Sequence, residues 1–149
     1  MSTQDVVDFL NSTEKLKIAP SKIHGVGVFA LVDIPKGTKL FADRAPQPYK
    51  ISQGNLSKLF PYVKDHLAER WPSMLVGNGF VYPDYFVQGF MNHADDCNYD
   101  NKLDLAIRDI SAGEEVTEDY RNIEGAEKAY PFLYPLDKKA TDTTIEVIK

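Results

Sequence analysis

The side chains best suited to chemistry gather in the segment from Asn92 to Asn98, which reads NHADDCN. Asn92 offers two hydrogen-bond donors and an acceptor, and neutral His93 offers one of each, so the pair matches the edge of a purine base. The acids and the cysteine could also ligate a metal. They lie too close together to surround one ion without distant ligands, so we expect no metal site. The simpler interpretation is a strand that ends in an ordinary polar turn.

A glycine pair, Gly25 and Gly27, flanks Val26 in the stretch KIHGVGVFA. Glycine at such positions lets the backbone approach a ligand closely, or supplies a positive φ in a bend. The stretch is not a dinucleotide-binding fingerprint, because it lacks a third glycine and no helical pattern follows. A bulge in a strand is the more common reason for the pattern.

The stretch GEEVTEDY runs from Gly113 to Tyr120. Gly113 suits a hairpin turn, Val116 can face the core, and Tyr120 can bring a phenol hydroxyl into a pocket. A tyrosine at the end of a strand is more commonly a packing residue with one hydrogen bond. Two acids after a glycine turn are more commonly solvated. None of the three stretches predicts a function by itself.

Taken together and in this order, the three stretches resemble the SET domain of protein lysine methyltransferases. That family has a glycine pair near the start, then a stretch like Asn-His-Ser-Cys-x-Pro-Asn, then a stretch like Gly-Glu-Glu-Leu-Thr-x-Asp-Tyr. The resemblance covers about residues 16–121. It implies a mainly β (β+α) fold, the SET-domain β-clip of short strands and hairpins with a helical insert and a threaded C-terminal segment.

The resemblance also implies a domain organisation and a reaction. Residues 1–149 would form a single SET domain, with the helical insert at about 53–72 and an aromatic C-terminal flap at about 122–149. The reaction would be transfer of a methyl group from S-adenosylmethionine to the side-chain amine of a protein lysine, with S-adenosylhomocysteine as the product.

The residues of the implied site follow position by position. Four of them would line the cofactor with their backbone: His24, Gly25, Val26 and Gly27. Asn92 and His93 would bind the adenine and amino-acid parts of the cofactor. Tyr120 would hold its hydroxyl beside the sulfonium and the incoming amine. A phenol has an ordinary pKa of about 10, so Tyr120 is suited to positioning and polarisation rather than to standing as a base.

The chemistry requires no covalent protein nucleophile, because the transferred carbon already lies on a cationic sulfur. The lysine amine, with an ordinary pKa of about 10.4, must lose its proton. A dry or cation-repelling channel has to favour the neutral amine, and the protein must align it with the methyl group.

The sequence departs from the family pattern in several places. Asp95 and Cys97 stand where the family often has cysteine and proline, and the cysteine-rich flanking segments of many relatives are missing. Aromatic residues of the C-terminal flap are then candidates to close the lysine channel: Tyr130, Phe132 and Tyr134. Glu118 stands where the family often has phenylalanine or tyrosine, at a position that influences how many methyl groups are added. Its carboxylate could form an ion pair with the substrate amine, or it could face away.

The elements that would position these residues are short. Residues 2–11 predict an amphipathic helix with Ser2 or Thr3 as its cap, and residues 16–40 are β-prone runs punctuated by glycines. The helical insert contains Pro61, where we expect a break. Residues 77–91 are aromatic and β-branched, which predicts strand and turn.

Two stretches near the motifs have patterns of their own. Residues 103–110, LDLAIRDI, alternate as a half-buried strand does. Residues 29–40 and 105–116 both place Asp-Ile, two residues and a glycine after an apolar run, which is typical of two hairpins with similar turns.

The composition is that of a globular domain, with 149 residues, 43% hydrophobic and 26% charged. One cysteine excludes an intrachain disulfide framework, and we expect an intracellular, soluble protein, cytoplasmic or nuclear. The net charge of −5 disfavours direct nucleic-acid binding and suits a lysine-containing, possibly histone-like, partner; no membrane partner is expected. The alternative function is a non-catalytic SET-fold module that binds a basic peptide or cofactor. A structural or carbohydrate-binding β-clip, suggested by DIPKGTKL, ranks below both.

Overall fold

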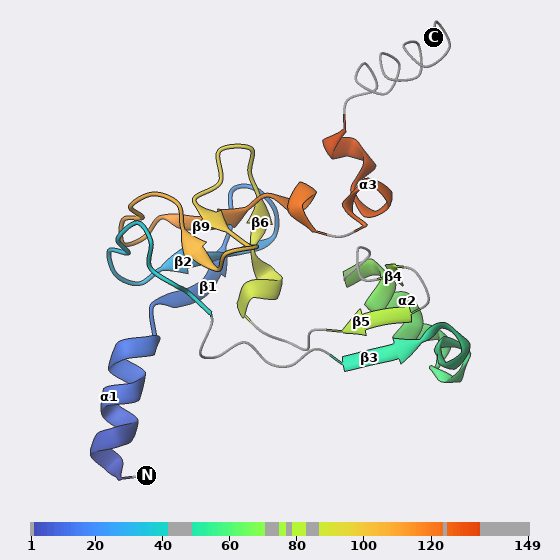
Figure 1. Ribbon diagram of the computed structural model, residues 1–149, viewed down its shortest axis with the longest axis horizontal. Helices are drawn as coiled ribbons and strands as arrows, with labels where there is room; N and C mark the ends of the chain where they lie inside the picture. The colour runs from blue at the N-terminus through green and yellow to red at the C-terminus, as the bar shows by residue number, and fades with distance from the viewer. Residues whose placement is uncertain are drawn as a thin grey trace, which may run out of the picture. The chain divides into compact units, whose positions relative to one another are not determined.

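Figure 1 shows the computed structural model, which describes residues 2–41, 49–70, 75–76, 79–82, 87–123 and 125–134. The chain divides into two compact units. The first unit consists of Met1–Gln47 and Pro83–Asp119, and the second of Pro48–Tyr82 and Tyr120–Lys149. The organisation as a single domain stays a prediction.

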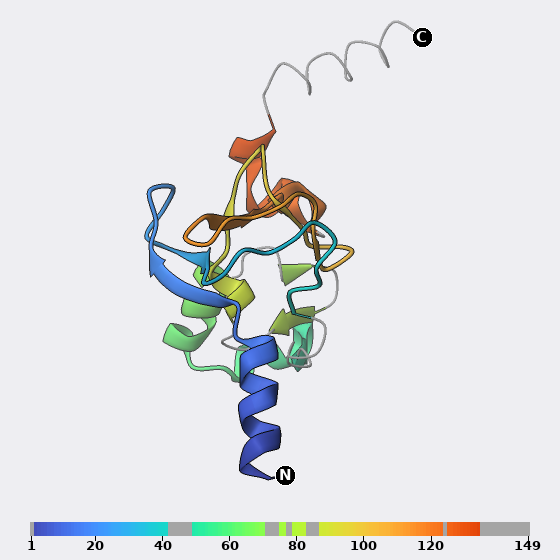
Figure 2. The ribbon, with the colours of Figure 1, turned by 90° about the vertical axis from the view of Figure 1, so that its left-hand side faces the viewer.

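The first unit begins with helix α1 (Thr3–Thr13), close to the helix predicted at residues 2–11. Ser2 is the cap: its Oγ accepts from Asp5 N at 3.1 Å, and its own N–H donates to the Asp5 carboxylate at 2.7 Å. This reciprocal capping box satisfies two backbone donors that a helix start leaves unpaired. No residue of α1 is buried, and the helix projects away from the sheet of its unit in both views (Figure 1, Figure 2).

A four-stranded sheet positions the motifs of the first unit. Its order is β1 (Leu16–Pro20), β2 (Val26–Ala30), β9 (Glu115–Glu118) and β6 (Asn92–His93). β2 runs antiparallel to both β1 and β9, whereas β6 and β9 are parallel, with Asn92 opposite Thr117 and His93 opposite Glu118. The sheet therefore joins the glycine stretch, the Asn-His stretch and the GEEVTEDY stretch side by side.

A single apolar cluster lies beneath these elements. Its buried members are Val28, Ala30, Ile34, Phe41, Met91, Tyr99, Ala106, Ile110 and Val116. Val116 has no exposed surface, which confirms that it faces the core. The 3-10 helix η3 (Val87–Phe90), which leads into β6, adds partly buried Val87 and Phe90 to this cluster.

The two similar segments, 29–40 and 105–116, pair with each other. Ile34 and Ile110 form a two-way bridge: each N–H donates to the carbonyl of the other, at 2.7 and 2.8 Å. Both side chains are 1% exposed. The similar sequences therefore belong to two segments that pair with each other through equivalent residues, and are not only two separate hairpins with similar turns.

The glycines of these segments occupy equivalent positions. Gly37 has φ 85° and Gly113 has φ 84°, a conformation that side chains rarely adopt. Gly37 N donates to Ala106 O at 2.7 Å, and Gly113 N donates to Ala30 O at 2.8 Å. Each turn thus closes onto the strand of the other segment.

The aspartates of the two segments exchange hydrogen bonds in the same reciprocal way. Asp33 Oδ1 accepts from Ala112 N at 2.8 Å, and Asp109 Oδ1 accepts from Lys36 N at 2.8 Å. Each aspartate satisfies a backbone donor in the opposite turn, so the repeated Asp-Ile pair has a structural reason at both positions.

The strand predicted at residues 103–110 is much shorter than expected. β8 covers only Leu105–Ala106 and pairs with β7 (Tyr99–Asp100). The chain then bends, leaves Ile107 39% exposed, and brings Ile110 to its bridge with Ile34. The predicted alternation is therefore wrong: Leu103 and Ile107, on its apolar side, are exposed, and the buried positions Ala106 and Ile110 have different partners.

The second unit contains the helical insert and the C-terminal segment. A three-stranded sheet has the order β3 (Tyr49–Ser52), β5 (Gly79–Tyr82) and β4 (Leu75–Val76). The insert consists of η1 (Gln53–Lys58) and α2 (Pro61–Arg70), which confirms the break near Pro61. Proline suits the first position of α2 because its missing N–H has no intrahelical partner there. Residues 71–72 of the predicted insert lie outside the described residues.

The C-terminal segment forms single turns: η4 (Tyr120–Asn122), α3 (Ala126–Ala129) and η5 (Pro131–Leu133). Residues 124 and 135–149 of the predicted flap lie outside the described residues. Where the structure describes the chain, none of its helices has the length and apolarity needed to cross a membrane. The mainly β fold of short strands and hairpins with a helical insert is confirmed, and the threading of the C-terminal segment stays a prediction.

Candidate functional site

Asn92 fastens the glycine stretch to strand β6. Its side chain is buried, with 7% of the residue exposed. The carboxamide nitrogen lies 2.9–3.2 Å from four oxygens: Ser21 Oγ, His24 O, Val26 O and Glu115 Oε1. Two N–H groups are shared among these four acceptors, so the nitrogen is fully engaged in holding the 21–26 turn. This leaves the carboxamide oxygen as the part of Asn92 suited to a ligand donor.

Glu115 is the second anchor of the same turn. Ser21 Oγ lies 2.9 and 3.0 Å from its two carboxylate oxygens and accepts from Ile23 N at 2.9 Å. Neither Ser21 nor Glu115 was predicted as a site residue, and the acids after Gly113, which are more commonly solvated in such a position, are both partly buried. The acids are partly buried because backbone and side-chain donors of distant segments converge on them.

The two glycines of the stretch are required for two different reasons. Gly25 has φ 48° and no atom within 4 Å of the position of a Cβ, so the bend itself favours glycine. A Cβ on Gly27 would collide with the Glu115 carboxylate and lie 3.1 Å from Asn92 Nδ2. The positive φ offered by the sequence occurs at Gly25, whereas Gly27 makes room for the Glu115 and Asn92 side chains; approach of this backbone to a ligand stays a prediction.

His93 lies at the end of β6 between two carboxylates. Its Nδ1 is 3.7 Å from Asp119 Oδ1, and its Nε2 is 3.5 Å from Asp95 Oδ1. The His93 and Asp119 side chains are 16% and 21% exposed, whereas Asp95 is 84% exposed. Because solvent screens the contact with Asp95, Asp119 is the carboxylate with the greater influence on the imidazole.

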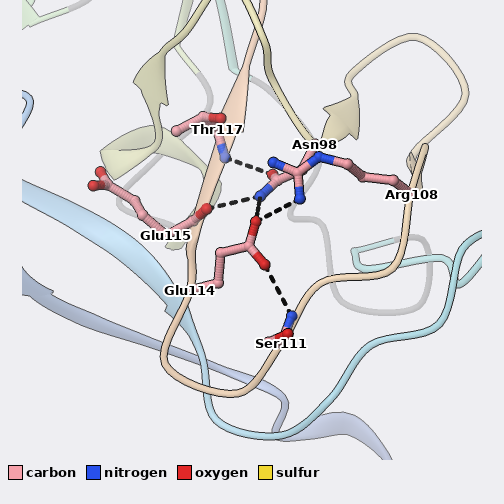
Figure 3. A network of polar contacts seen from close by, with 6 residues as sticks. All are labelled: Asn98, Arg108, Ser111, Glu114, Glu115 and Thr117. Carbon is pink, nitrogen blue, oxygen red and sulfur yellow. Dashed lines mark hydrogen bonds and ion pairs between the residues drawn. The ribbon is translucent and has the colours of Figure 1, made fainter.

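Asn98 ties the loop after β6 to strand β9 (Figure 3). It is 1% exposed; its Oδ1 accepts from Thr117 N at 2.9 Å, and its Nδ2 donates to Glu115 O at 2.8 Å. A neighbouring strand would make the same hydrogen bonds to these backbone groups, so the Asn98 side chain takes the place of backbone pairing along this part of β9. Sequence reasoning placed Asn98 in the motif without assigning this role.

Glu114 extends the network toward the hairpin turn (Figure 3). Its carboxylate accepts from Ser111 N at 3.0 Å and from Asn98 Nδ2 at 3.3 Å, and it forms an ion pair with Arg108. The hydrogen bond from Ser111, followed by those from Arg108 and Asn98, lowers the pKa of Glu114. Arg108 is a site neighbour that no sequence motif indicated.

Glu118 is buried next to the predicted cofactor wall. It is 7% exposed, and it lies opposite His93 in the parallel register. Its Oε2 accepts from Asn101 Nδ2 at 2.9 Å. Burial raises the pKa of Glu118 to about 7. The residue that departs most from the family pattern is therefore a sheltered acid rather than a solvated one.

The aromatic residues belong to the second unit. The rings of Tyr120 and Tyr130 pack with centroids 4.8 Å apart, and Phe132 contacts Tyr130 edge-on at 6.2 Å. Phe132 is 77% exposed, and Tyr134 is partly buried. The structure thus brings Tyr120 together with two of the three predicted channel residues. Its proximity to the cofactor residues of the first unit stays a prediction.

Burial, followed by the charge of Asp119, raises the pKa of Cys97, which disfavours the thiolate form. In the part of the chain that the structure describes, no three histidine, cysteine or acidic side chains form a group that could hold a metal ion. The expectation of a site without metal stays a prediction.

The cofactor positions predicted from the sequence are brought together in the first unit: His24, Gly25, Val26, Gly27, Asn92 and His93. Comparison with protein families matches the SET domain to residues 25–121, more than half of the chain. This chain belongs to the SET-domain family. The resemblance on which the sequence interpretation rested is confirmed, and with it membership of a methyltransferase family.

Among the solved structures that match, a candidate histone methyltransferase from Plasmodium falciparum is 20% identical, with a TM-score of 0.48 over 71% of this chain and 92% of the other. An apo form of ctPRC2 with two mutations in Ezh2 is 25% identical, with a TM-score of 0.46 over 76% of this chain and 16% of the other. No curated protein matches. At these TM-scores the family match, not the neighbours, decides the assignment.

Proposed function

We propose that this SET-domain protein transfers a methyl group from S-adenosylmethionine to the side-chain amine of a protein lysine. The observation that carries the proposal is the buried Asn92 carboxamide, which joins the His24–Gly27 turn, strand β6 and Glu115 of strand β9. One side chain thereby unites the three stretches that define the family pattern.

The residues of the first unit fit the cofactor. His24, Gly25 and Val26 are exposed residues, and the turn carries no side chain at Gly25 that would obstruct a ligand. The Asn92 carboxamide oxygen would accept from the α-amino group of the cofactor, while His93 at the end of β6 would contact its adenine. Asn98 would not contact the cofactor; it would position the site by holding the loop after β6 against β9.

The bound cofactor would supply an activated methyl group on a cationic sulfur. Tyr120 would hold the incoming lysine nitrogen in line with that methyl group, with Tyr130 packed on its ring as support. Tyr130, Phe132 and Tyr134 would exclude water from the amine, which favours the neutral form that can accept a methyl group. The target would be a lysine-containing protein attracted by the net charge of −5, with histone-like proteins among the candidates.

A second candidate function is a non-catalytic SET-fold module for a basic peptide or cofactor. Buried Glu118 favours it, because an acid replaces the aromatic residue that relatives often carry near the substrate amine. Replacement Glu118→Phe separates the two: a gain of methyl transfer identifies the acid as an obstacle, and an unchanged rate removes Glu118 from the argument.

The test of the proposed function is methyl transfer from labelled cofactor to a panel of lysine-rich proteins, including histones, followed by mass spectrometry of the product. Tyr120→Phe is the matched control, because it removes one hydroxyl and keeps the ring that packs on Tyr130. Lysine methylation that falls at least tenfold in the control supports the proposal. Absence of labelled lysine across the panel, in a protein that binds the cofactor, favours the non-catalytic module.

A further inference from the structure

Glu118 is a buried acid that lacks the usual compensation. A buried carboxylate is strongly disfavoured unless it has a cation or several donors as partners. The titratable groups on the neighbouring elements are His93 on β6, Cys97 before β7, Tyr99 and Asp100 on β7, and Asp119 next in the chain. None of these five is a lysine or an arginine. The hydrogen bond that the Glu118 carboxylate accepts comes from a neutral donor, Asn101 Nδ2, at 2.9 Å.

Asn101 has the complementary deficit. Its nitrogen donates to Glu118 Oε2 at 2.9 Å and to the carbonyl of Asp119 at 3.3 Å. Its oxygen, Oδ1, is buried and has no hydrogen-bond partner among the residues that the structure describes. A buried acceptor without a donor is rare, because it has lost its hydration and gained nothing in exchange. The contact between Glu118 and Asn101 therefore contains more buried acceptor oxygens than donors: among the described residues, the Glu118 carboxylate receives one hydrogen bond, and Asn101 Oδ1 receives none.

One proton removes both deficits. We propose that Glu118 keeps a proton in the folded protein at pH 6, where exposed acids are ionised, and donates it to Asn101 Oδ1, so that the acid and the amide form a closed pair with two hydrogen bonds. Glu118 Oε1 carries the proton and donates, Asn101 Oδ1 accepts, and Asn101 Nδ2 donates back to Glu118 Oε2. The buried pair then carries no charge, and it needs no other group to satisfy its donors and acceptors.

The closed pair has a consequence for the site. It joins the turn after β7 to the end of β9, two residues before Tyr120. A neutral Glu118 cannot form an ion pair with a cationic lysine amine, so it would not hold the substrate in its unreactive protonated form. This consequence alone rests on the proposed function; the proton itself is testable without any substrate.

The test compares the wild-type protein with Glu118→Gln and Glu118→Ala by thermal unfolding from pH 4 to pH 9. Glutamine reproduces the neutral acid, because its NH₂ can donate to Asn101 Oδ1 while its oxygen accepts from Asn101 Nδ2. Burial raises the pKa of Glu118 in the folded protein to about 7, from an ordinary value of 4.5. The proton therefore stabilises the folded protein fully below about pH 4.5, and this stabilisation is lost as the pH rises to about 7.

The wild-type protein should therefore lose stability relative to Glu118→Gln over this window, by on the order of 100-fold in the folding equilibrium. Glu118→Ala leaves Asn101 Oδ1 without a partner and Asn101 Nδ2 with only its 3.3 Å hydrogen bond to the carbonyl of Asp119, so it should be less stable than Glu118→Gln at every pH. Glu114→Gln is the matched control. Because hydrogen bonds lower the pKa of Glu114, the stability that this acid contributes to the wild-type protein is lost as the pH falls, which is the opposite of the dependence expected for Glu118.

Infrared titration of the wild-type protein gives a second readout that does not depend on the folding of any variant. The proposal requires a protonated-carboxyl band that persists at pH 6, where exposed acids are ionised, and that is missing in Glu118→Gln. Unfolding curves of wild-type protein and Glu118→Gln that stay parallel from pH 4 to pH 9 would overturn it, as would an infrared spectrum at pH 6 without that band. Neither outcome would affect the proposed methyl transfer, which is measured separately.

Discussion

Replacement of Asn98 tests whether one buried carboxamide stands in for a strand of the sheet. Asn98→Ala removes the acceptor of Thr117 N and the donor to Glu115 O, which lie 2.9 and 2.8 Å from the Asn98 side chain. Each backbone group then stays buried without a partner, at about 1–3 kcal/mol. We expect the free energy of unfolding to fall by about 2–5 kcal/mol, a large part of the 5–15 kcal/mol typical of a domain.

The isosteric change Asn98→Asp sharpens the test, because it alters hydrogen bonding and leaves the volume unchanged. One aspartate oxygen can still accept from Thr117 N, but the other faces two acceptors, Glu115 O and the Glu114 carboxylate. At pH 7 this variant should be at least as unstable as Asn98→Ala. Protonation restores a donor, so the variant should recover relative to the wild-type protein as the pH approaches the ordinary aspartate pKa of about 3.9, whereas Asn98→Ala should not.

Urea denaturation followed by far-ultraviolet circular dichroism measures all three proteins at pH 7 and at pH 4. A cost below about 0.5 kcal/mol for Asn98→Asp at pH 7 would refute the reasoning, because surface substitutions commonly have effects of that size. Equal responses of the alanine and aspartate variants to acid would refute it as well.

Four further substitutions test three separate parts of the account. Gly27→Ala should displace the Glu115 carboxylate and lower the free energy of unfolding by about 1–3 kcal/mol in urea denaturation; a neutral effect would mean that the collision is relieved without loss of hydrogen bonds. Asp33→Ala and Asp109→Ala should have similar costs of about 0.5–1.5 kcal/mol in the same assay, since their hydrogen bonds are equivalent; a difference above 1 kcal/mol would contradict the equivalence of the two segments. Tyr120→Phe should reduce methyl transfer at least tenfold while calorimetry finds nearly unchanged cofactor affinity; full activity would remove Tyr120 from the mechanism.

Local signals in the sequence predicted the elements whose causes are local. Ser2 marks the start of α1 because its capping partner is three residues away, and Pro61 marks the start of α2 because its own ring determines the backbone there. The order of the three motifs was enough to recognise the family. The inward position of Val116 also followed from its own strand.

Contacts between distant segments were not predictable from local pattern. The similarity of residues 29–40 and 105–116 was visible, but their pairing with each other depends on the fold, since the two segments are far apart in the chain. The alternation of residues 103–110 did not predict burial: Leu103 and Ile107, on the apolar side of the pattern, are 62% and 39% exposed, whereas Ala106 and Ile110 are buried. A period of two indicates burial only along a continuous strand, and here the strand ends at Ala106.

The roles of single polar residues were the least predictable. Asn101 had no motif to mark it, and its importance arises from the acid that the fold places 2.9 Å away. Glu115 was expected in solvent, but Ser21 and Asn92 meet its carboxylate from segments more than 20 residues distant. A charged residue after a turn gives no local indication of donors that arrive from elsewhere in the fold.

The central claim is that the turn at His24–Gly27 and strand β6 form a binding site for S-adenosylmethionine. Calorimetric titration of the purified protein with S-adenosylmethionine, and then with S-adenosylhomocysteine, tests it without knowledge of the methylated target. The account predicts saturable one-to-one binding that is weakened about tenfold or more by Asn92→Ala, since that change releases the turn and leaves polar groups unpaired at about 1–3 kcal/mol. No binding at millimolar cofactor, by a protein whose circular dichroism shows it to be folded, would contradict it.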